Sequence, residues 1–189
     1  MAMKDPTDLF DQNTELLLGE IDRILVYLSK LDEKNENPLL VFCDFDDTLF
    51  YRRGFRQKIE KGEIEEAYNI PITPMPHTLE FMNFLKEKNV PMIIVTKRTT
   101  SDTIKKKFQE YKLDDHIEEF LNQRNEQTQD GSTSTISKGQ IICEYLEKRR
   151  KPQGILFVDD MKENNESVSF WMSRRYPEIE TRTVLIPGE

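Results

Sequence analysis

The sequence of 189 residues contains few of the residues that build disulfide frameworks and zinc sites: two cysteines and two histidines. Cys43 lies in an apolar run and Cys143 in GQIICEYLEK, so we expect buried free thiols in a reducing compartment. A disulfide between them is the open alternative. Two histidines without clustered cysteines argue against a zinc site, and we expect His77 and His116 to be structural or exposed.

Long hydrophobic runs and an excess of positive charge are also missing. No stretch approaches the ~20 apolar residues that span a bilayer, and the start, MAMKDPTDLF, lacks a signal-peptide pattern. The net charge of −8 argues against nucleic acid or an anionic membrane as a partner. We expect one cytoplasmic domain with a substantial core. Because the ending LIPGE follows a strand-like run directly, we expect this domain to be cut from a longer protein; nothing indicates its oligomeric state.

The first part of the chain predicts an amphipathic helix over residues 14–35, with Thr14 as its N-cap. Its apolar residues recur at helical spacing: Leu17, Ile21, Ile24, Leu25, Leu28 and Leu31. We expect residues 1–37 to pack through this helix on the core of a domain that spans residues 38–189.

Strands and helices then alternate. Continuous apolar runs predict buried strands at 38–44, 90–96, 154–160 and 181–187, with a short strand at 117–122. Helices are predicted at 75–89, 100–117, 137–151 and 163–177, the first with Leu79, Met82 and Leu85 on one side. Alternating elements of this kind predict an α/β fold: a doubly wound parallel sheet in three layers, with helices on both faces.

The segment VFCDFDDTLF, residues 41–50, places Asp44, Asp46 and Asp47 in an otherwise apolar run. Burying ionised carboxylates without partners is very unfavourable, so these side chains need a cation. In a parallel sheet, ligands bind beyond the carboxyl ends of the strands. Polar residues occur at the ends of several predicted strands and at one helix start: Asp44, Asp46, Thr96, Asp159, Asp160 and Lys138.

We therefore expect these residues to converge at one sheet edge, where a divalent cation and a lysine would offset the repulsion between carboxylates. Oxygen ligands of this kind suit Mg²⁺ together with a phosphate group. The structural alternatives are strand-end capping for Thr96 and a solvated helix start for Lys138.

Four segments resemble the motifs of the haloacid dehalogenase (HAD) superfamily, in the same order. DFDDT is similar to the first motif, Asp-x-Asp-x-Thr after an apolar strand, and IIVT to the second. Lys138 in STISKGQ is similar to the third motif and LFVDDMKEN to the fourth. Asn164 stands where many members have a second aspartate. The resemblance covers about residues 38–187 and implies a HAD-like Rossmann-type fold.

The resemblance also implies roles. Asp44 would attack phosphorus and form an aspartyl phosphate, and Asp46 would act as general acid and base. Thr96 would donate a hydrogen bond to the phosphoryl group, and Lys138 would neutralise charge. Mg²⁺ would be held by Asp44, the backbone carbonyl of Asp46, and Asp160. We expect Asp47 and Thr48 to fix the loop after the first strand. We expect Asp159 and Asn164 to orient Lys138 and the water molecules bound to the metal.

The intervals between the motifs leave no room for a large cap domain, so we expect an open site beside a short basic flap at about residues 50–71. In the flap, YRRGFRQK interleaves aromatic and basic residues. Arginine pairs with phosphate and carboxylate, and aromatic rings stack on a tyrosyl ring or a base. The residues expected to bind substrate are Arg52, Arg53, Phe55, Arg56 and Lys97. A solvated loop is the alternative.

These features favour a Mg²⁺-dependent phosphomonoester hydrolase. The second aspartate and the metal argue against a dehalogenase, and the missing water-excluding cap argues against a mutase. An open, aromatic-lined site favours a phosphorylated protein or peptide, phosphotyrosine in particular. The composition resembles that of HAD-type tyrosine phosphatase domains of bacterial effectors, which implies the host cytoplasm if the protein is secreted. The alternatives are a small-molecule phosphatase or nucleotidase capped by an oligomeric partner, and a catalytically silent binding module.

Overall fold

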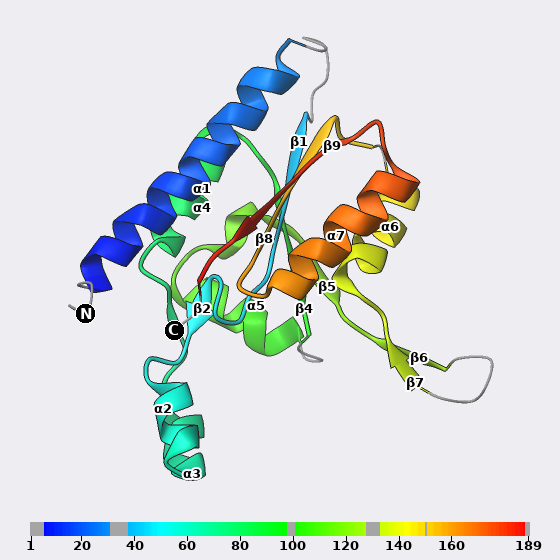
Figure 1. The fold of residues 1–189 in the computed structure, drawn as a ribbon. Helices are drawn as coiled ribbons and strands as arrows, with labels where there is room; N and C mark the ends of the chain where they lie inside the picture. The colour runs from blue at the N-terminus through cyan, green and yellow to red at the C-terminus, as the bar shows by residue number, and fades with distance from the viewer. Residues whose placement is uncertain (1–5, 31–37, 98–100, 128–132, 150, 188–189) are drawn as a thin grey trace, which may run out of the picture.

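A parallel sheet of five strands forms the centre of the protein (Figure 1). The computed structural model describes residues 6–30, 38–97, 101–127, 133–149 and 151–187. The strand order is β5-β4-β1-β8-β9. Their bounds are β1 Leu39–Cys43, β4 Met92–Thr96, β5 Ile117–Asn122, β8 Gly154–Asp159 and β9 Glu180–Leu185. The chain moves outward from β1 in both directions, which confirms the doubly wound parallel sheet.

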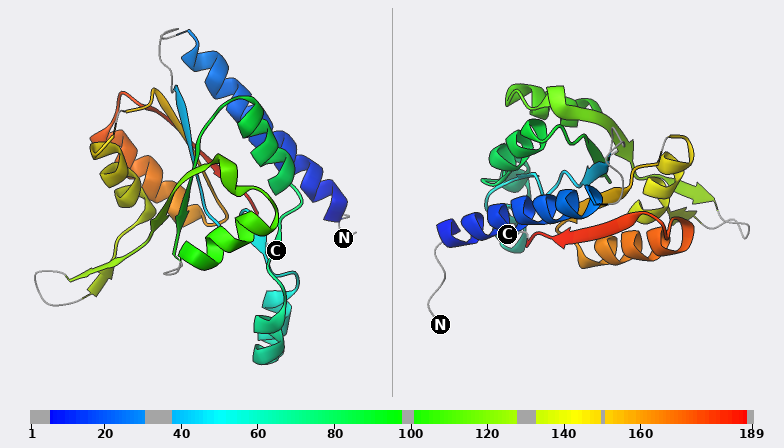
Figure 2. Two further views of the ribbon diagram at one scale, coloured as in Figure 1. Left: turned by 180° about the vertical axis from the view of Figure 1, so that it is seen from behind. Right: turned by 90° about the horizontal axis from the view of Figure 1, so that it is seen from above.

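Helices cover both faces of the sheet (Figure 2). On one face α1 (Pro6–Leu28), α4 (Thr78–Glu87) and α5 (Ser101–Glu110) pack on Leu39, Val41 and Cys43 of β1. On the other face α6 (Lys138–Glu147) and α7 (Lys162–Arg175) pack on the intervening residues of β1, Leu40 and Phe42. Successive strand residues point to opposite faces, so a strand buried on both sides is apolar throughout. The three-layer prediction is therefore confirmed.

Two small additions project from the edge of the sheet at which β1, β4 and β8 end (Figure 1). The first is the flap: β2 (Phe50–Tyr51) pairs with β3 (Thr73–Pro74), and α2 (Phe55–Glu60) and α3 (Ile64–Asn69) form a helical hairpin between them. The second is a β-hairpin of β6 (Asn125–Gln127) and β7 (Thr133–Thr135), which the sequence patterns did not predict. A short 3₁₀ turn, η1, covers Asp114–His116.

Several predicted boundaries were wrong. α1 begins at Pro6, a residue favoured in the first turn of a helix, so Thr14 lies inside α1 and is no N-cap. The helix predicted to reach residue 117 ends at Glu110, because Lys112 takes a left-handed conformation with φ 57°. Leu79 is 45% exposed, and Phe81 takes its place in the core. Leu31 and the rest of residues 31–37 lie outside the described residues.

Both cysteines are buried free thiols, as predicted, and they lie on opposite faces of the sheet. Within the described residues, no helix is both long and apolar enough to cross a membrane.

Candidate active site

The loop after β1 places Asp44 at the sheet edge. The Asp44 backbone N–H donates to the carbonyl of Val158 in β8, at 2.9 Å, so the chain is still tied to the sheet there. It then turns sharply, with Asp47 in a left-handed conformation that aspartate tolerates. The rings of Phe45 and Phe50 stack at 4.8 Å beneath this turn. The turn buries Asp44 and leaves Asp46 and Asp47 half-buried.

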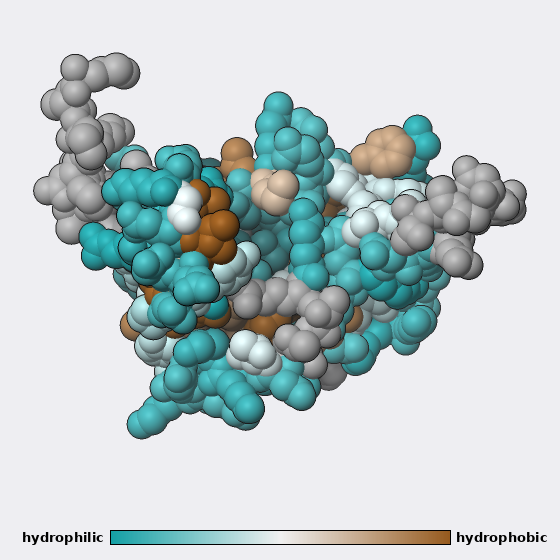
Figure 3. All heavy atoms as spheres, turned by 90° about the horizontal axis from the view of Figure 1, so that it is seen from below, coloured by the Kyte–Doolittle hydropathy of each residue, from teal (hydrophilic) through white to brown (hydrophobic). Residues whose placement is uncertain are grey.

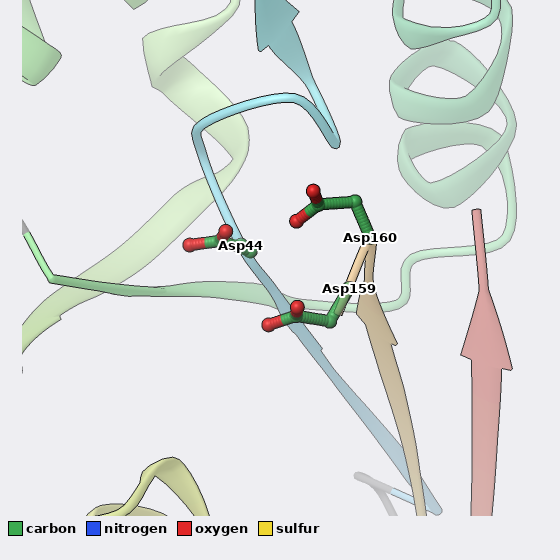
Figure 4. A group of neighbouring side chains, drawn as sticks. All are labelled: Asp44, Asp159 and Asp160. Atoms are coloured by element: carbon green, nitrogen blue, oxygen red, sulfur yellow. The ribbon is translucent and has the colours of Figure 1, made fainter. Parts of the chain in front are cut away.

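Three carboxylates meet at this edge, from Asp44 after β1 and from Asp159 and Asp160 at the end of β8. One oxygen from each lies within 4.8 Å of the others, and Figure 4 shows all three carboxylates directed to the same side. The two strands are neighbours in the sheet, with Cys43 opposite Val158. Convergence of these acids, which the strand ends predicted, is therefore observed.

Lys138 is the cation of this group. As the first residue of α6 it is set by a capping box, in which Ser137 and Gln140 bond reciprocally. Its Nζ lies 2.7 Å from an oxygen of Asp44 and 2.7 Å from an oxygen of Asp159. With 1% of its surface exposed, Lys138 is no solvated helix start, and that alternative is wrong.

Asp159 is fully engaged by protein groups. The Asn164 Nδ2 donates to both of its carboxylate oxygens, at 3.0 and 3.1 Å, and the Met161 N–H donates at 2.8 Å. Together with Lys138, these donors satisfy the carboxylate and hold it still. Asp159 is therefore fixed beside Lys138, and Asp44 and Asp160 are the two acids of the group that could hold a metal.

Thr48 connects the β1 loop to the β8 loop. Its hydroxyl oxygen accepts a hydrogen bond of 3.0 Å from the Asp160 N–H. Its own carbonyl lies 2.8 Å from the Nε2 of His77, which is 1% exposed. Burial lowers the pKa of His77, so the ring is neutral and Nε2–H donates to the carbonyl. No local pattern predicts this link, because His77 and Thr48 are 29 residues apart in the chain.

Burial and mutual repulsion oppose ionisation of the acids. Burial, with Asp159 nearby, raises the pKa of Asp44 to about 7 although Lys138 opposes the shift. Burial, with Asp159 and Asp47 nearby, raises the pKa of Asp160 to about 6. For Lys138, burial alone would lower the pKa, but the two carboxylates outweigh it and the pKa is raised. Three carboxylates with one ammonium group leave excess negative charge, and hard oxygen donors of this kind fit Mg²⁺.

Asp46 faces a different space. Its side chain is outside the group of three carboxylates and lines a cavity of about 490 Å³. The other walls come from the β1 loop and the flap: Asp47, Tyr51, Arg52, Phe55, Tyr68 and Ile72. The rings of Phe55 and Tyr68 meet edge to face at 5.3 Å. This flap cavity therefore places two aspartates, Asp46 and Asp47, beside an aromatic wall.

Two of the flap arginines, Arg52 and Arg56, have partners within the protein. The Arg52 guanidinium donates to the carbonyls of Tyr68, at 2.6 Å, and Ile70, which holds the end of α3. Arg56 lies 3.1 Å from Asp47 and 3.8 Å from Asp160. Arg53 and Arg56 are exposed, whereas Arg52 and Phe55 are half-buried.

The end of β4 supplies two further predicted residues. Thr96 is fully buried, and Lys97 is exposed with its Nζ 3.6 Å from the sulfur of Met161 beyond β8. Figure 3 views the molecule from this edge of the sheet: the surface is mostly hydrophilic, and hydrophobic side chains gather on the side where the flap projects. Exposed apolar side chains of the flap are Ile59, Ile64 and Tyr68.

Comparison with known proteins finds no matching family model and no matching curated protein sequence. Solved structures do match. A HAD-superfamily hydrolase from Ehrlichia chaffeensis is 14% identical, with a TM-score of 0.51 over 80% of this chain and 89% of that one. The HAD domain of the Legionella pneumophila effector Lem4 is 15% identical, with a TM-score of 0.52 over 80% and 87%. The Legionella pneumophila effector Ceg4 is 17% identical, with a TM-score of 0.53 over 82% and 90%. At these identities the likeness shows the fold.

Proposed function

We propose that this chain, which has the fold of the HAD-superfamily hydrolases, is a Mg²⁺-dependent phosphomonoester hydrolase that forms an aspartyl phosphate. The observation that carries the proposal is the buried Lys138, which bridges Asp44 and Asp159 while Asp160 lies beside them. A binding module would gain little from three desolvated acids around one lysine. A phosphoryl-transfer site needs this arrangement, because charge develops on the phosphoryl oxygens.

In the first step an oxygen of Asp44 attacks phosphorus, and the bond from phosphorus to the leaving oxygen breaks. Asp46 gives its proton to that oxygen, so the product leaves as an alcohol or phenol. In the second step Asp46 takes a proton from water, whose oxygen attacks phosphorus and releases phosphate and Asp44. Asp46 lies in the flap cavity, apart from Asp44. This position supports its role as general acid and base, since the leaving group would occupy that cavity.

The remaining groups offset charge. Lys138 stays bonded to the nucleophile Asp44 and is held by Asp159, so it needs no reorganisation during the reaction. Thr96 lies at the end of the neighbouring strand, as the predicted hydrogen-bond donor to a phosphoryl oxygen. Asp44, Asp160 and the backbone carbonyl of Asp46 would hold Mg²⁺, which supplies positive charge to the phosphoryl oxygens.

For the substrate, we propose phosphotyrosine in a protein. Tyr51, Phe55 and Tyr68 give the flap cavity an aromatic wall, and Asp46 lies in the same cavity, where the phenolic oxygen would leave. Aromatic rings favour edge-to-face or offset contact with another ring, which a phosphoseryl side chain lacks. The likeness to two bacterial effector domains supports a protein substrate and action in a host cytoplasm.

The test is hydrolysis of para-nitrophenyl phosphate with Mg²⁺ and with EDTA, beside phosphotyrosyl and phosphoseryl peptides and a nucleotide panel. We expect turnover that requires Mg²⁺ and Asp44, and that favours the phosphotyrosyl peptide. Asp44→Asn should abolish turnover, whereas Asp114→Asn, at an exposed aspartate far along the chain, serves as the matched control. Turnover confined to nucleotides would favour a small-molecule phosphatase, and no turnover on any compound would favour a binding module.

A further inference from the structure

Four apolar side chains form a row along the flap, two from each of its helices: Phe55 and Ile59 on α2, and Ile64 and Tyr68 on α3. The members of each pair are four residues apart, so they share one side of their helix. The rings of Phe55 and Tyr68 meet edge to face at 5.3 Å. Because the first residue of α2 thus contacts the second half of α3, the helices run antiparallel, and Ile59 and Ile64 lie toward the tip. We call this row the flap strip.

The flap strip begins in the flap cavity and continues beyond it. Phe55 and Tyr68 line that cavity, whereas Ile59 and Ile64 do not. The exposed fraction is 38% for Ile59, 56% for Ile64 and 63% for Tyr68. Single exposed apolar side chains are common on protein surfaces, but a contiguous row beside a cavity is typical of an interaction site.

Arg52 holds the flap strip in place at its base. Its guanidinium donates to the carbonyls of Tyr68, at 2.6 Å, and Ile70, and the end of a helix leaves such carbonyls without partners inside the helix. Helices of six residues are not stable on their own, so these hydrogen bonds fix the position of α3. Tyr68 is therefore kept beside the cavity, and the strip is formed before any ligand arrives.

We propose that the flap strip binds an apolar side chain of a protein substrate, two residues from the phosphotyrosine. A phosphotyrosyl ring in the flap cavity, with its phenolic oxygen toward Asp46, has its main chain at the cavity mouth, where the strip continues. An extended peptide advances ~3.3 Å per residue and alternate side chains point the same way, so the second side chain lies ~6.6 Å along. Four residues of helix rise ~6 Å, which matches the step from Phe55 to Ile59. The inference rests on the proposed function, with phosphotyrosine as substrate.

The size of the flap strip favours a short peptide segment over a folded partner or a second copy of this chain. Each flap helix has six residues and is therefore about 9 Å long. A stable interface between folded proteins buries about 800 Å² on each partner, far more than one side of two such helices offers. One aliphatic side chain, by contrast, is small enough for Ile59 and Ile64 to cover.

The test compares two phosphotyrosyl peptides that differ only at the second residue on each side of the phosphotyrosine, with leucine in one and serine in the other. For wild type we expect kcat/KM to be about tenfold higher on the leucine peptide, equivalent to about 1.4 kcal/mol, because the strip covers part of the leucine surface. Ile64→Gln should reduce this preference to about threefold or less. On para-nitrophenyl phosphate it should change kcat/KM less than about twofold.

Glu66→Gln is the matched control. Glu66 is exposed on the same helix, and two residues of helix turn it to the side opposite Ile64. This variant receives the same new side chain and should keep the tenfold preference. Ile59→Gln replaces Ile64→Gln if circular dichroism shows that the latter fails to fold.

Three results would overturn the proposal. The first is a wild type without preference for the leucine peptide, and the second is an Ile64→Gln variant that keeps the preference or loses activity equally on peptide and aryl phosphate. The third is gel filtration that shows a dimer for wild type and a monomer for Ile64→Gln, because the strip would then bind a second copy.

Failure of the proposed function gives a different result. If wild type turns over neither peptide, that function fails on its own. Fluorescence anisotropy of the two labelled peptides then decides the inference. Equal affinities of wild type for both peptides refute it, and a tenfold preference that Ile64→Gln loses supports it.

Discussion

The pKa of Asp44 predicts an unusual pH dependence of stability for the metal-free protein. Burial raises this pKa from 3.8 to about 7 in the folded state. Between these values the folded protein holds a proton that the unfolded chain has lost. The free energy of unfolding therefore falls as pH rises through this window, and it levels off above the folded pKa.

The magnitude follows from the shift. From pH 5 to pH 8, Asp44 contributes over about 2 pH units, which amounts to about 3 kcal/mol. Asp44→Asn cannot titrate, so this share of the pH dependence should vanish. The difference in unfolding free energy between wild type and Asp44→Asn should thus change by about 3 kcal/mol between the two pH values. Relative to Asp44→Asn, the wild type should be less stable at pH 8 than at pH 5.

Urea unfolding in EDTA at pH 5 and pH 8 measures this difference. Asp114→Asn, at an exposed aspartate, should run parallel to wild type at both values. A difference between wild type and Asp44→Asn that stays constant within about 0.5 kcal/mol would refute the reasoning, since Asp44 would then be ionised at pH 5. Saturating Mg²⁺ should abolish the effect in wild type, because a bound cation favours the ionised carboxylate.

Three further predictions concern single residues. Lys138→Met should abolish turnover and lower the free energy of unfolding by about 3–5 kcal/mol, because it leaves two buried carboxylates without their cation; a free energy of unfolding equal to that of wild type, measured in urea, would contradict this. Asp46→Asn should slow aryl phosphate hydrolysis at least ~100-fold while the urea midpoint stays unchanged, and a smaller loss would exclude it as general acid. Arg56→Gln should tighten Mg²⁺ binding about two- to fivefold in titration calorimetry, because the cation 3.8 Å from Asp160 no longer competes; Arg53→Gln on the same segment should not.

The sheet and the position of the site could be predicted because both leave local signals. A strand covered on both faces is a continuous apolar run, as Leu39–Cys43 and residues 154–158 are. Each of these runs ends in acids, and parallel strands bring their carboxyl ends to one edge. Asp44 and Asp159 were therefore expected at the same edge, and they lie close together because β1 and β8 are neighbours in the sheet.

The partners of the flap cations left no such signal. In the sequence, arginines lie beside aromatic residues, a pattern that predicted a phosphate-binding surface. In the structure Arg52 donates hydrogen bonds to the carbonyls of Tyr68 and Ile70. Arg56 lies 3.8 Å from Asp160, which directly follows β8. These contacts join residues with no periodic relation. The β6–β7 hairpin was missed for a similar reason, because strands of three residues are too short to show an alternating pattern.

The charges explain why three carboxylates are tolerated at the end of a buried strand. When all three are ionised, Asp44, Asp159 and Asp160 with Lys138 leave two negative charges, and Arg56 offsets part of this from 3.8 Å. A divalent cation would cancel both charges and would release Arg56 from Asp160. The guanidinium, still 3.1 Å from Asp47, would then lie at the flap, where the proposed phosphate group would arrive, and guanidinium pairs well with phosphate. Metal binding would in this way supply a second cation to the substrate without any change in the fold.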